Sequence, residues 1–254
     1  MTRQDHPRLS SRTVARQSLS ESTLEAMWLV FSNYYEDVTR DRFMGDLAGK
    51  SHVILLKDRG DGSVQGFSTL DTWDRTIGGR RVIVVYSGDT VVARPYWGQT
   101  ALQRAFLRFV MGRKVAHPFT PVYWFLISKG YKTYLLLARN FPEHWPRHDR
   151  PTPSWQALLI DTLARERFGL EWRPKEGVLR HDKPLGRLRE DIAPIDDSLL
   201  SAPDIAFFVR RNPGYTRGDE LCCIGRVGLD LWTSYMTKLA RRVISRAWPG
   251  AADE

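Results

Sequence analysis

The stretch RRVIVVYSGDTVVARPYWGQTALQRAFLRFVMG, residues 80–112, decides the fold. Residues 82–85 are β-branched and predict a buried strand. The sequence Ser87-Gly88-Asp89 allows a bend or bulge in that strand, which residues 90–92 resume. From Gly98 onward the apolar residues recur at the spacing of one helix face. Residues 80–112 therefore predict a strand, a tight turn and a helix. The apolar face of this helix consists of Leu102, Ala105, Phe106, Phe109 and Val110.

The start of this helix is a candidate ligand site. A helix N-terminus presents free backbone N–H groups and the positive end of the helix dipole, which together suit a phosphate. Gly98, Gln99, Thr100 and Ala101 lie in this first turn, and Gly98 lets a ligand approach the backbone. An ordinary strand–helix junction without a ligand is the alternative interpretation.

The neighbouring segments extend the pattern on both sides. Ser20 or Ser22 caps a predicted helix that reaches residue 35, and Thr39 caps a second, short helix. Residues 51–57 and 64–73 read as strands joined by the turn at residues 58–62. Residues 121–127 predict another buried strand and residues 130–140 a further helix. The order is therefore helix, helix, three antiparallel strands, helix, strand and helix.

This order over about residues 20–140, together with the Pro-Tyr-Trp-Gly-Gln segment before the helix, resembles the GNAT superfamily, the Gcn5-related N-acyltransferases. The resemblance implies an α/β (α+β) fold with a mixed, mostly antiparallel sheet flanked by helices. It also implies an acyl-CoA co-substrate. The backbone of Val91 and Val92 would bind the pantetheine arm, and Gly98 with the three residues that follow it would hold the pyrophosphate.

The family's reaction suggests the catalytic candidates. An amine attacks a thioester, so one group must accept the proton of the amine and another must stabilise the leaving thiolate. The family often places a tyrosine on the helix after the second of two splayed strands as the acid toward the thiolate, and Tyr131 and Tyr134 match that place. Ser128 is expected to polarise the thioester. Asp89 or Glu36 is the candidate base, although a buried tyrosine or a solvated carboxylate explains each of these residues without catalysis.

The chain divides into three predicted parts. Residues 1–20 read as a flexible basic tail, residues 21–228 as the GNAT-like domain, and residues 229–254 as a C-terminal amphipathic helix and tail. An insertion at about residues 142–200 is expected to shape an acyl or acceptor pocket. Residues 206–210 and 220–226 are predicted to be the last two strands of the sheet.

Composition limits the choice of partners. The 254 residues carry a net charge of +9, and a basic surface attracts CoA phosphates, acidic carrier proteins, anionic lipid or nucleic acid. No nucleic-acid-binding motif accompanies the charge, so nucleic acid is not expected as a partner. The adjacent Cys222 and Cys223 lie in an apolar run and read as core residues. His144 and His148 have the spacing of helical metal ligands, but Pro146 between them argues against a helix, so no metal is expected.

The leading functional hypothesis is acyl transfer from acyl-CoA, or from an acyl carrier protein, to an amine that the sequence does not identify. The protein is expected to be cytoplasmic, with peripheral contact at the inner membrane surface as an open alternative. A second hypothesis is a non-catalytic binding module of the same fold, which Trp97, Thr100 and Leu102 at the family's loop positions favour. A third is a membrane-surface or nucleic-acid binder driven by the basic termini.

Overall fold

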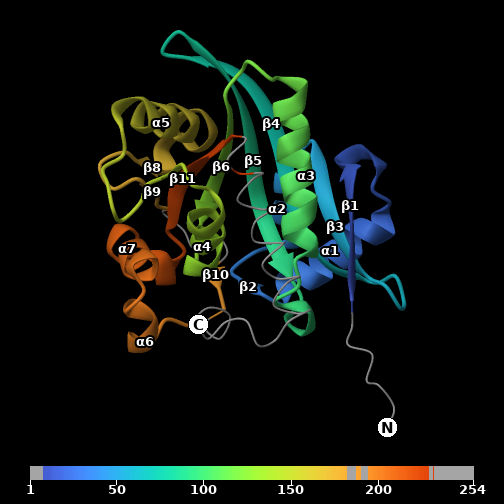
Figure 1. Cartoon of the computed structure of the whole chain (residues 1–254). Coiled ribbons are helices and arrows are strands. Elements are labelled where there is room, and N and C mark those ends of the chain that lie inside the picture. The colour runs from blue at the N-terminus through green and yellow to red at the C-terminus, as the bar shows by residue number, and fades with distance from the viewer. Residues whose placement is uncertain (1–7, 182–186, 190–193, 229–230, 232–254) are drawn as a thin grey trace, which may run out of the picture.

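The structure is a computed structural model that describes residues 8–181, 187–189, 194–228 and 231. Its centre is a nine-stranded sheet in which the strands follow the order β1-β3-β4-β5-β6-β11-β9-β8, with β7 paired to β11. Only β5 and β6 run parallel, and every other pair is antiparallel. Figure 1 shows this sheet with α3 in front of it. The strands of the sheet are β1 Leu9–Ala15, β3 His52–Asp58, β4 Val64–Ile77, β5 Arg80–Val92, β6 Val122–Ser128, β7 His144–Trp145, β8 Trp172–Arg173, β9 Val178–Leu179 and β11 Glu220–Val227.

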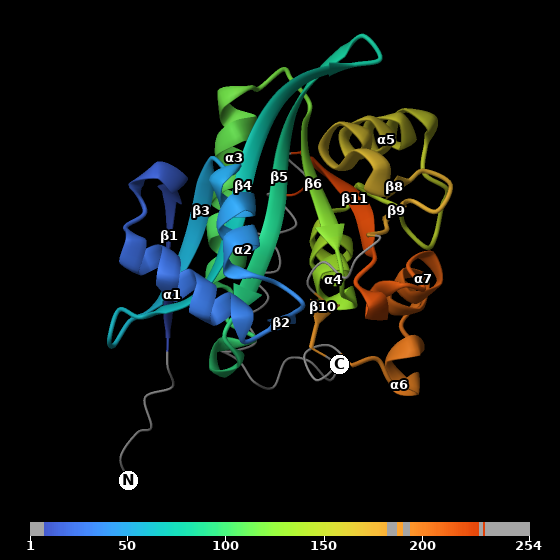
Figure 2. The ribbon, with the colours of Figure 1, turned by 180° about the vertical axis from the view of Figure 1, so that it is seen from behind.

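Helices cover both faces of the sheet. On one face, α3 and α4 pack with α7 against residues such as Ile83 and Val85 of β5. On the other face, α5 packs against the alternate β5 residues, and α1 and α2 cover β3 and β4 (Figure 2). Strand β2 Tyr35–Glu36 pairs separately with β10 Arg187–Leu188. The helices are α1 Glu21–Ser32, α2 Arg40–Ala48, α3 Ala101–Ala116, α4 Tyr131–Asn140, α5 Ser154–Phe168, α6 Asp197–Leu200 and α7 Pro203–Arg211.

The sequence predicts this architecture well in its centre. The helices and strands expected between residues 20 and 140 are all present, and the mixed, mostly antiparallel sheet flanked by helices is confirmed. Successive residues of β5 point to opposite faces of the sheet, and residues 82–86 are all apolar and buried. Both faces of the sheet at β5 therefore need a cover of other elements.

The central pair of strands parts at a bulge. Strands β5 and β6 pair from Ile83↔Val122 to Ser87↔Leu126, and no pairing follows. At the same level Gly88 and Asp89 of β5 stand opposite the single residue Thr69 of β4, which is the predicted bulge. A Cβ atom on Gly88 would lie 2.8 Å from the Thr69 hydroxyl, so the bulge needs glycine there. The bulge turns β5 away from β6 and leaves the two strands splayed.

Two predicted segments are wrong. Residues 9–15 of the expected flexible tail form β1, which pairs with β3 over seven residues and buries Leu9. Its remaining side chains are polar or half-exposed because β1 is the edge of the sheet, and a polar edge strand has no apolar alternation to reveal it. Residues 206–210 belong to helix α7, not to a strand. Ile205 and Phe208 lie on one side of that helix and are buried against α4.

The later part of the chain adds elements to both the sheet and its helical cover. The region expected to be an insertion contributes α5, β8 and β9, which extend the helical cover and the edge of the sheet. Of the predicted C-terminal helix, only Leu231 falls within the described residues, where it is buried in the core beside α3 and α4. The rest of that helix and residues 1–7 lie outside the described residues.

Candidate functional site

Two cavities flank the sheet where β5 and β6 diverge. One has a volume of about 610 Å³ and lies on the α3 and α4 side, and the other has a volume of about 340 Å³ and lies beside α2 and α5. We call them the apolar cavity and the polar cavity. Four residues line both of them and form what we call the junction: Gly88, Thr90, Ile127 and Thr133. The two cavities therefore meet at the splay of the two strands.

The apolar cavity begins at the start of α3. Thr100, the N-cap residue of α3, lies in its wall, and the side chain of Thr100 makes no capping hydrogen bond. The N–H groups of the first turn of α3 are therefore not satisfied by that side chain. Beyond it the cavity is lined by apolar side chains from α3, β6, the C-terminal half of α4 and Leu231, and by the polar side chains of Gln103, Arg139 and Asn140. The apolar side chains are Leu102, Phe106, Leu107, Trp124, Ile127, Leu136, Phe141 and Leu231.

The polar cavity carries charges of both signs. Four carboxylates and four cations line it, together with His181 and the hydroxyls of Tyr35 and Tyr86. The acidic residues are Asp46, Asp89, Glu171 and Glu220, and the basic residues are Arg42, Lys50, Lys129 and Arg167. They come from α2 and the residues just after it, the bulge of β5, the loop after β6, α5 and the turn that follows it, and the first residue of β11. Only the folded sheet brings these segments together.

Asp89 lies in the bulge at the edge of the junction. Burial raises the pKa of the Asp89 carboxyl above its ordinary value, although the positive charges of Lys50 and Lys129 act against that shift. A carboxylate with a raised pKa holds a proton more firmly than an ordinary aspartate, which suits a general base. Glu36, the other predicted base, does not line either cavity and lies 4.0 Å from Arg189.

His181 and Glu220 form a second polar group in the polar cavity, which we call the His181–Glu220 pair. The Nε2 atom of His181 lies 3.2 Å from Glu220 Oε1, and its Nδ1 atom lies 3.0 Å from Glu171 Oε1. Burial lowers the pKa of His181, but the hydrogen bonds to Glu220 and Glu171 outweigh it, so the pKa is raised. Lys129 Nζ lies 3.6 Å from Glu220. Sequence reasoning missed this cluster, because His181 and Glu220 carry no motif.

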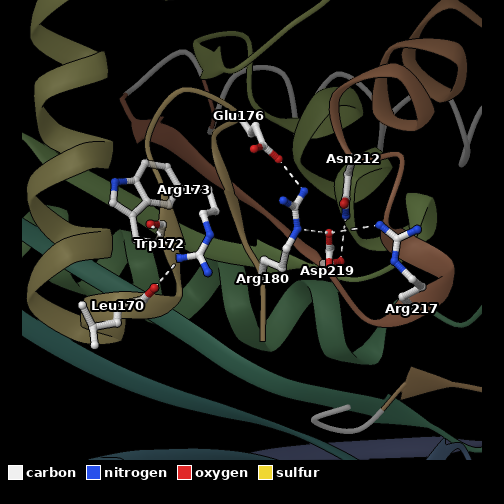
Figure 3. Close-up of polar contacts among 8 residues, drawn as sticks. All are labelled: Leu170, Trp172, Arg173, Glu176, Arg180, Asn212, Arg217 and Asp219. Carbon is white, nitrogen blue, oxygen red and sulfur yellow. Dashed lines mark hydrogen bonds and ion pairs between the residues drawn. The ribbon is translucent and has the colours of Figure 1, made fainter. Parts of the chain in front are cut away.

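A separate polar network fixes the backbone next to this pair. Arg180 Nε donates to Asp219 Oδ2 at 3.2 Å, and Asn212 Nδ2 donates to the Asp219 carbonyl at 2.8 Å. Figure 3 shows Arg180 between Glu176 and Asp219, with Arg217 on the far side of Asp219. Arg180 and Asp219 immediately precede His181 and Glu220 in the chain, so this network holds the two segments that carry the His181–Glu220 pair in place.

Lys50 and Arg167 stand near one aromatic ring. The Lys50 ammonium lies 5.4 Å from the centroid of the Tyr86 ring, and the Arg167 guanidinium carbon lies 5.7 Å from the same centroid. Lys50 is 8% exposed and donates to the Asp46 carbonyl at 3.2 Å. Burial lowers the pKa of Lys50, and the charge of Arg167 adds to that lowering while Asp89 opposes it.

The predicted acids lie off the walls of both cavities. Ser128 is buried and donates to the Gly130 carbonyl at 2.9 Å. Tyr134 is fully buried and donates to the Pro146 carbonyl at 3.1 Å. Tyr131 is buried in the core that α3 and α4 share. The α4 residue at the junction is instead Thr133, which sequence reasoning did not select.

The predicted cofactor residues gather around the end of β5 and the start of α3. Gly98 has φ +83°, and a Cβ atom there would meet open space, so the close approach expected of a ligand is sterically free. Ala101 opens α3 and is buried. The side chain of Gln99, by contrast, is engaged by the protein itself, because it accepts the Leu9 N–H at 2.9 Å.

Val91 and Val92 point to opposite faces of the sheet, and β4 pairs with both of them. The carbonyl of Val92 accepts the indole N–H of Trp97 at 2.7 Å. Trp97 itself is covered by Lys132 of α4, whose ammonium lies 4.4 Å from the ring centroid. Trp97 therefore links the end of β5 to the first turn of α4.

The described residues offer neither a metal cluster nor a helix that could span a membrane. They contain no group of three or more His, Cys, Asp or Glu side chains arranged to hold a metal ion. His144 Nδ1 lies 2.8 Å from the Phe141 carbonyl, and His148 lies 3.6 Å from Asp204, so the two histidines contact different partners. Among the helices of the described residues, none has the length and apolar character needed to cross a membrane.

No family model matches the chain, and no curated protein matches it. Solved structures do show likenesses. An acyl-CoA N-acyltransferase from Pseudomonas aeruginosa is 18% identical with a TM-score of 0.35, over 46% of this chain and 79% of that one. A GNAT-family N-acetyltransferase from Escherichia coli, solved in complex with CoA, is 12% identical with a TM-score of 0.35, over 48% of this chain and 65% of that one.

A probable N-acyltransferase from Enterococcus faecalis is 12% identical with a TM-score of 0.40, over 87% of this chain and 66% of that one. Because these TM-scores are low, the fold is assigned from the order of helices and strands that the structure itself shows. The helix pair, the three antiparallel strands, the central helix and the strand that splays from β5 follow one another as the sequence resemblance implied. The chain has a GNAT-like fold, with additional elements after α4.

Proposed function

We propose that the protein transfers an acyl group from acyl-CoA to an amine by direct attack of the amine on the thioester. The observation that carries the proposal is the meeting of an apolar and a polar cavity at the junction between the splayed strands. A two-substrate reaction needs such an arrangement, because donor and acceptor must approach one carbonyl carbon from different sides.

The polar cavity supplies the chemistry for the acceptor. With the amine in that cavity and the thioester carbonyl at the junction, a C–N bond forms as the C–S bond breaks. Asp89 takes the proton of the amine, and its raised pKa matches that task. The His181–Glu220 pair stands farther along the wall as the route by which a proton reaches solvent.

The leaving CoA thiolate needs a hydrogen-bond donor. Sequence reasoning offers Tyr131, Tyr134 and Ser128, and the structure adds the Thr133 hydroxyl. Thr133 lies at the junction and in the first turn of α4, whose N-cap residue, Gly130, has no side chain to cap it. The positive end of the dipole of this helix favours a negative charge that develops beside its first turn.

The donor is proposed to lie in the apolar cavity. The N-terminal turn of α3, with Gly98, Thr100 and Ala101, would hold the pyrophosphate of CoA, and Lys132 lies near it on α4. A volume of about 610 Å³ with apolar walls also offers room for an acyl group beyond acetyl. An acyl carrier protein presents the same pantetheine arm, so it remains the second candidate donor.

A non-catalytic binding module is the alternative function. The bond from Trp97 to the Val92 carbonyl favours it, because that bond occupies a backbone acceptor that the pantetheine arm is expected to use. The two functions differ in whether the protein releases free CoA.

Native mass spectrometry of the purified protein with acetyl-, octanoyl- and palmitoyl-CoA, followed by a thiol-release assay with a mixed amine pool, tests the proposal. We expect a bound acyl-CoA and amine-dependent release of free CoA. Binding without release would support the module, and absence of binding by all three thioesters would direct the search to an acyl carrier protein.

A further inference from the structure

We propose that the polar cavity selects an acceptor in which the amine is accompanied by an anionic group, and that Lys50 and Arg167 bind that anion. An amino acid, with its carboxylate, is the simplest such molecule. The inference rests on the proposed function, because it names the acceptor class for the same site. It draws on side chains that the acyl-transfer step itself does not use.

Lys50 is the first part of the argument. An ammonium group has three hydrogen-bond donors, and Lys50 uses one of them on the Asp46 carbonyl. No described carboxylate lies within ion-pair distance of Lys50, although the side chain is 8% exposed. A buried charge is costly unless it is paired. Asp89 acts on Lys50 only through a longer-range charge interaction. Lys50 lines the polar cavity, so an anion bound there would give it a direct ion-pair partner.

Arg167 is the second part. Its charged neighbours on α5 are paired, because Arg165 lies 2.8 Å from Asp161 and Glu166 lies 3.1 Å from Arg75. Within the described part of the chain, Arg167 has no such ion pair. Its guanidinium lies near the Tyr86 ring that Lys50 also approaches. A planar guanidinium beside an ammonium is a suitable receptor for a carboxylate or a phosphate, each of which offers several oxygen atoms.

The acidic side of the same cavity suits the amine. Asp89 stands at the junction, and Glu220 lies beyond it beside Lys129 and His181. An ammonium group entering the cavity is therefore attracted toward the junction while the anion is held by Lys50 and Arg167. A plain amine would leave the two cations unpaired, and this difference would make the site specific. The cavity volume of about 340 Å³ lies at the small end of the range of ligand sites.

The test compares matched acceptors. Free CoA is measured with octanoyl-CoA as donor and two pairs of acceptors: the common amino acids with the corresponding amino-acid amides, and phosphoethanolamine with ethanolamine, which lacks the anionic group. Arg167→Gln and Lys50→Met are compared with Arg165→Gln, which removes an exposed α5 cation that does not line the cavity. Binding of the same pools is followed separately by the shift of the thermal unfolding midpoint.

We expect the amino acids, or phosphoethanolamine, to exceed their counterparts without an anionic group by about ten- to hundredfold in kcat/KM, as loss of a charged hydrogen bond predicts. Arg167→Gln and Lys50→Met should lose that preference, and Arg165→Gln should keep it. A preference for the amino acids would identify a carboxylate as the bound anion, and a preference for phosphoethanolamine would identify a phosphate. Equal use of the amines without an anionic group by the wild type would overturn the inference and leave the proposed function intact.

Absence of turnover in every pool would count against the proposed function, and the binding measurement then decides the inference. Stabilisation by an anionic pool that Arg167→Gln abolishes and Arg165→Gln retains would sustain the anion site. No stabilisation by any anionic pool, or the same stabilisation in both variants, would refute it. Retained folding of each variant is checked by its unfolding midpoint without ligand.

Discussion

The Nε2 atom of His181 lies 3.2 Å from the carboxylate of Glu220, and the residues immediately before them, Arg180 and Asp219, form their own pair at 3.2 Å. Two consecutive residues that follow β9 therefore pair with two consecutive residues at the beginning of β11. One pair is part of the network that fixes the strand edge (Figure 3), and the other faces the polar cavity.

The raised pKa of His181 predicts how stability depends on pH. Its folded-state pKa exceeds the ordinary value of 6.5, so the protonated form is favoured by folding. The stabilisation is therefore complete below pH 6.5 and is lost as pH rises through the folded pKa. We expect the difference in unfolding free energy between wild type and His181→Asn to be larger at pH 5.5 than at pH 8.5, measured by urea titration.

His52 provides the opposite sign as a control. Burial, together with the charge of Arg113, lowers the pKa of His52. Its contribution is present above pH 6.5 and is lost as pH falls through the lowered pKa. His52→Asn should therefore give the reverse slope, and the same slope in both variants would contradict the assignment for His181.

Asp89→Asn tests the proposed base. The substitution keeps the size of the side chain and removes its ability to take a proton, so turnover should fall by roughly a hundred- to ten-thousandfold while acyl-CoA binding remains. In the wild type, kcat/KM should fall as pH decreases through the raised pKa of Asp89, because the protonated carboxyl cannot act as a base. Glu36→Gln is the control and should retain near wild-type turnover.

Asp89 also predicts a stability effect of unusual sign for an aspartate. Because folding raises its pKa, the folded state holds more protons than the unfolded state between pH 3.8 and the raised value. The contribution of Asp89 to the free energy of unfolding therefore decreases as pH rises through that window. The wild type should lose stability relative to Asp89→Asn as pH rises above 4 in thermal scans.

Three hydroxyl deletions separate the candidate acids. Thr133→Val should lower turnover by about ten- to hundredfold, since Thr133 alone among the three lines both cavities. Tyr134→Phe should lower stability by about 1 kcal/mol, because it removes the hydrogen bond to the Pro146 carbonyl. Tyr131→Phe completes the set. A turnover loss confined to a tyrosine variant would return the acid role to the residues chosen from the sequence.

Gly98 tests the donor site by charge alone. Gly98→Asn and Gly98→Asp add side chains of nearly equal size at a position with φ +83°, which both residues tolerate better than most. The aspartate adds a negative charge beside the expected pyrophosphate. We expect CoA to raise the unfolding midpoint of Gly98→Asn much more than that of Gly98→Asp. Equal protection of the two variants would place the pyrophosphate elsewhere.

Local patterns in the sequence determined the centre of this fold. The β-branched run of residues 82–85 favours a strand that is buried on both faces. The helical spacing of the apolar residues after Gly98 gives α3 one apolar face, which packs on the sheet. The bulge at Gly88 was also predictable, because Ser87-Gly88-Asp89 interrupts the apolar run of the strand. These features depend on neighbours in the chain, and neighbours in the chain are what a sequence displays.

Only the tertiary structure decided the rest. Strand β1 is polar because its position at the edge of the sheet requires no apolar face. The sequence of α4 also did not show which of its sides meets a cavity: Tyr134 is fully buried, whereas the preceding residue, Thr133, lines the junction. His181 and Glu220 are 39 residues apart, and Lys50 meets Arg167 near Tyr86 only because α2 and α5 pack on the same face of the sheet. Charges so distant in sequence leave no local pattern, since their pairing is a property of the packed sheet.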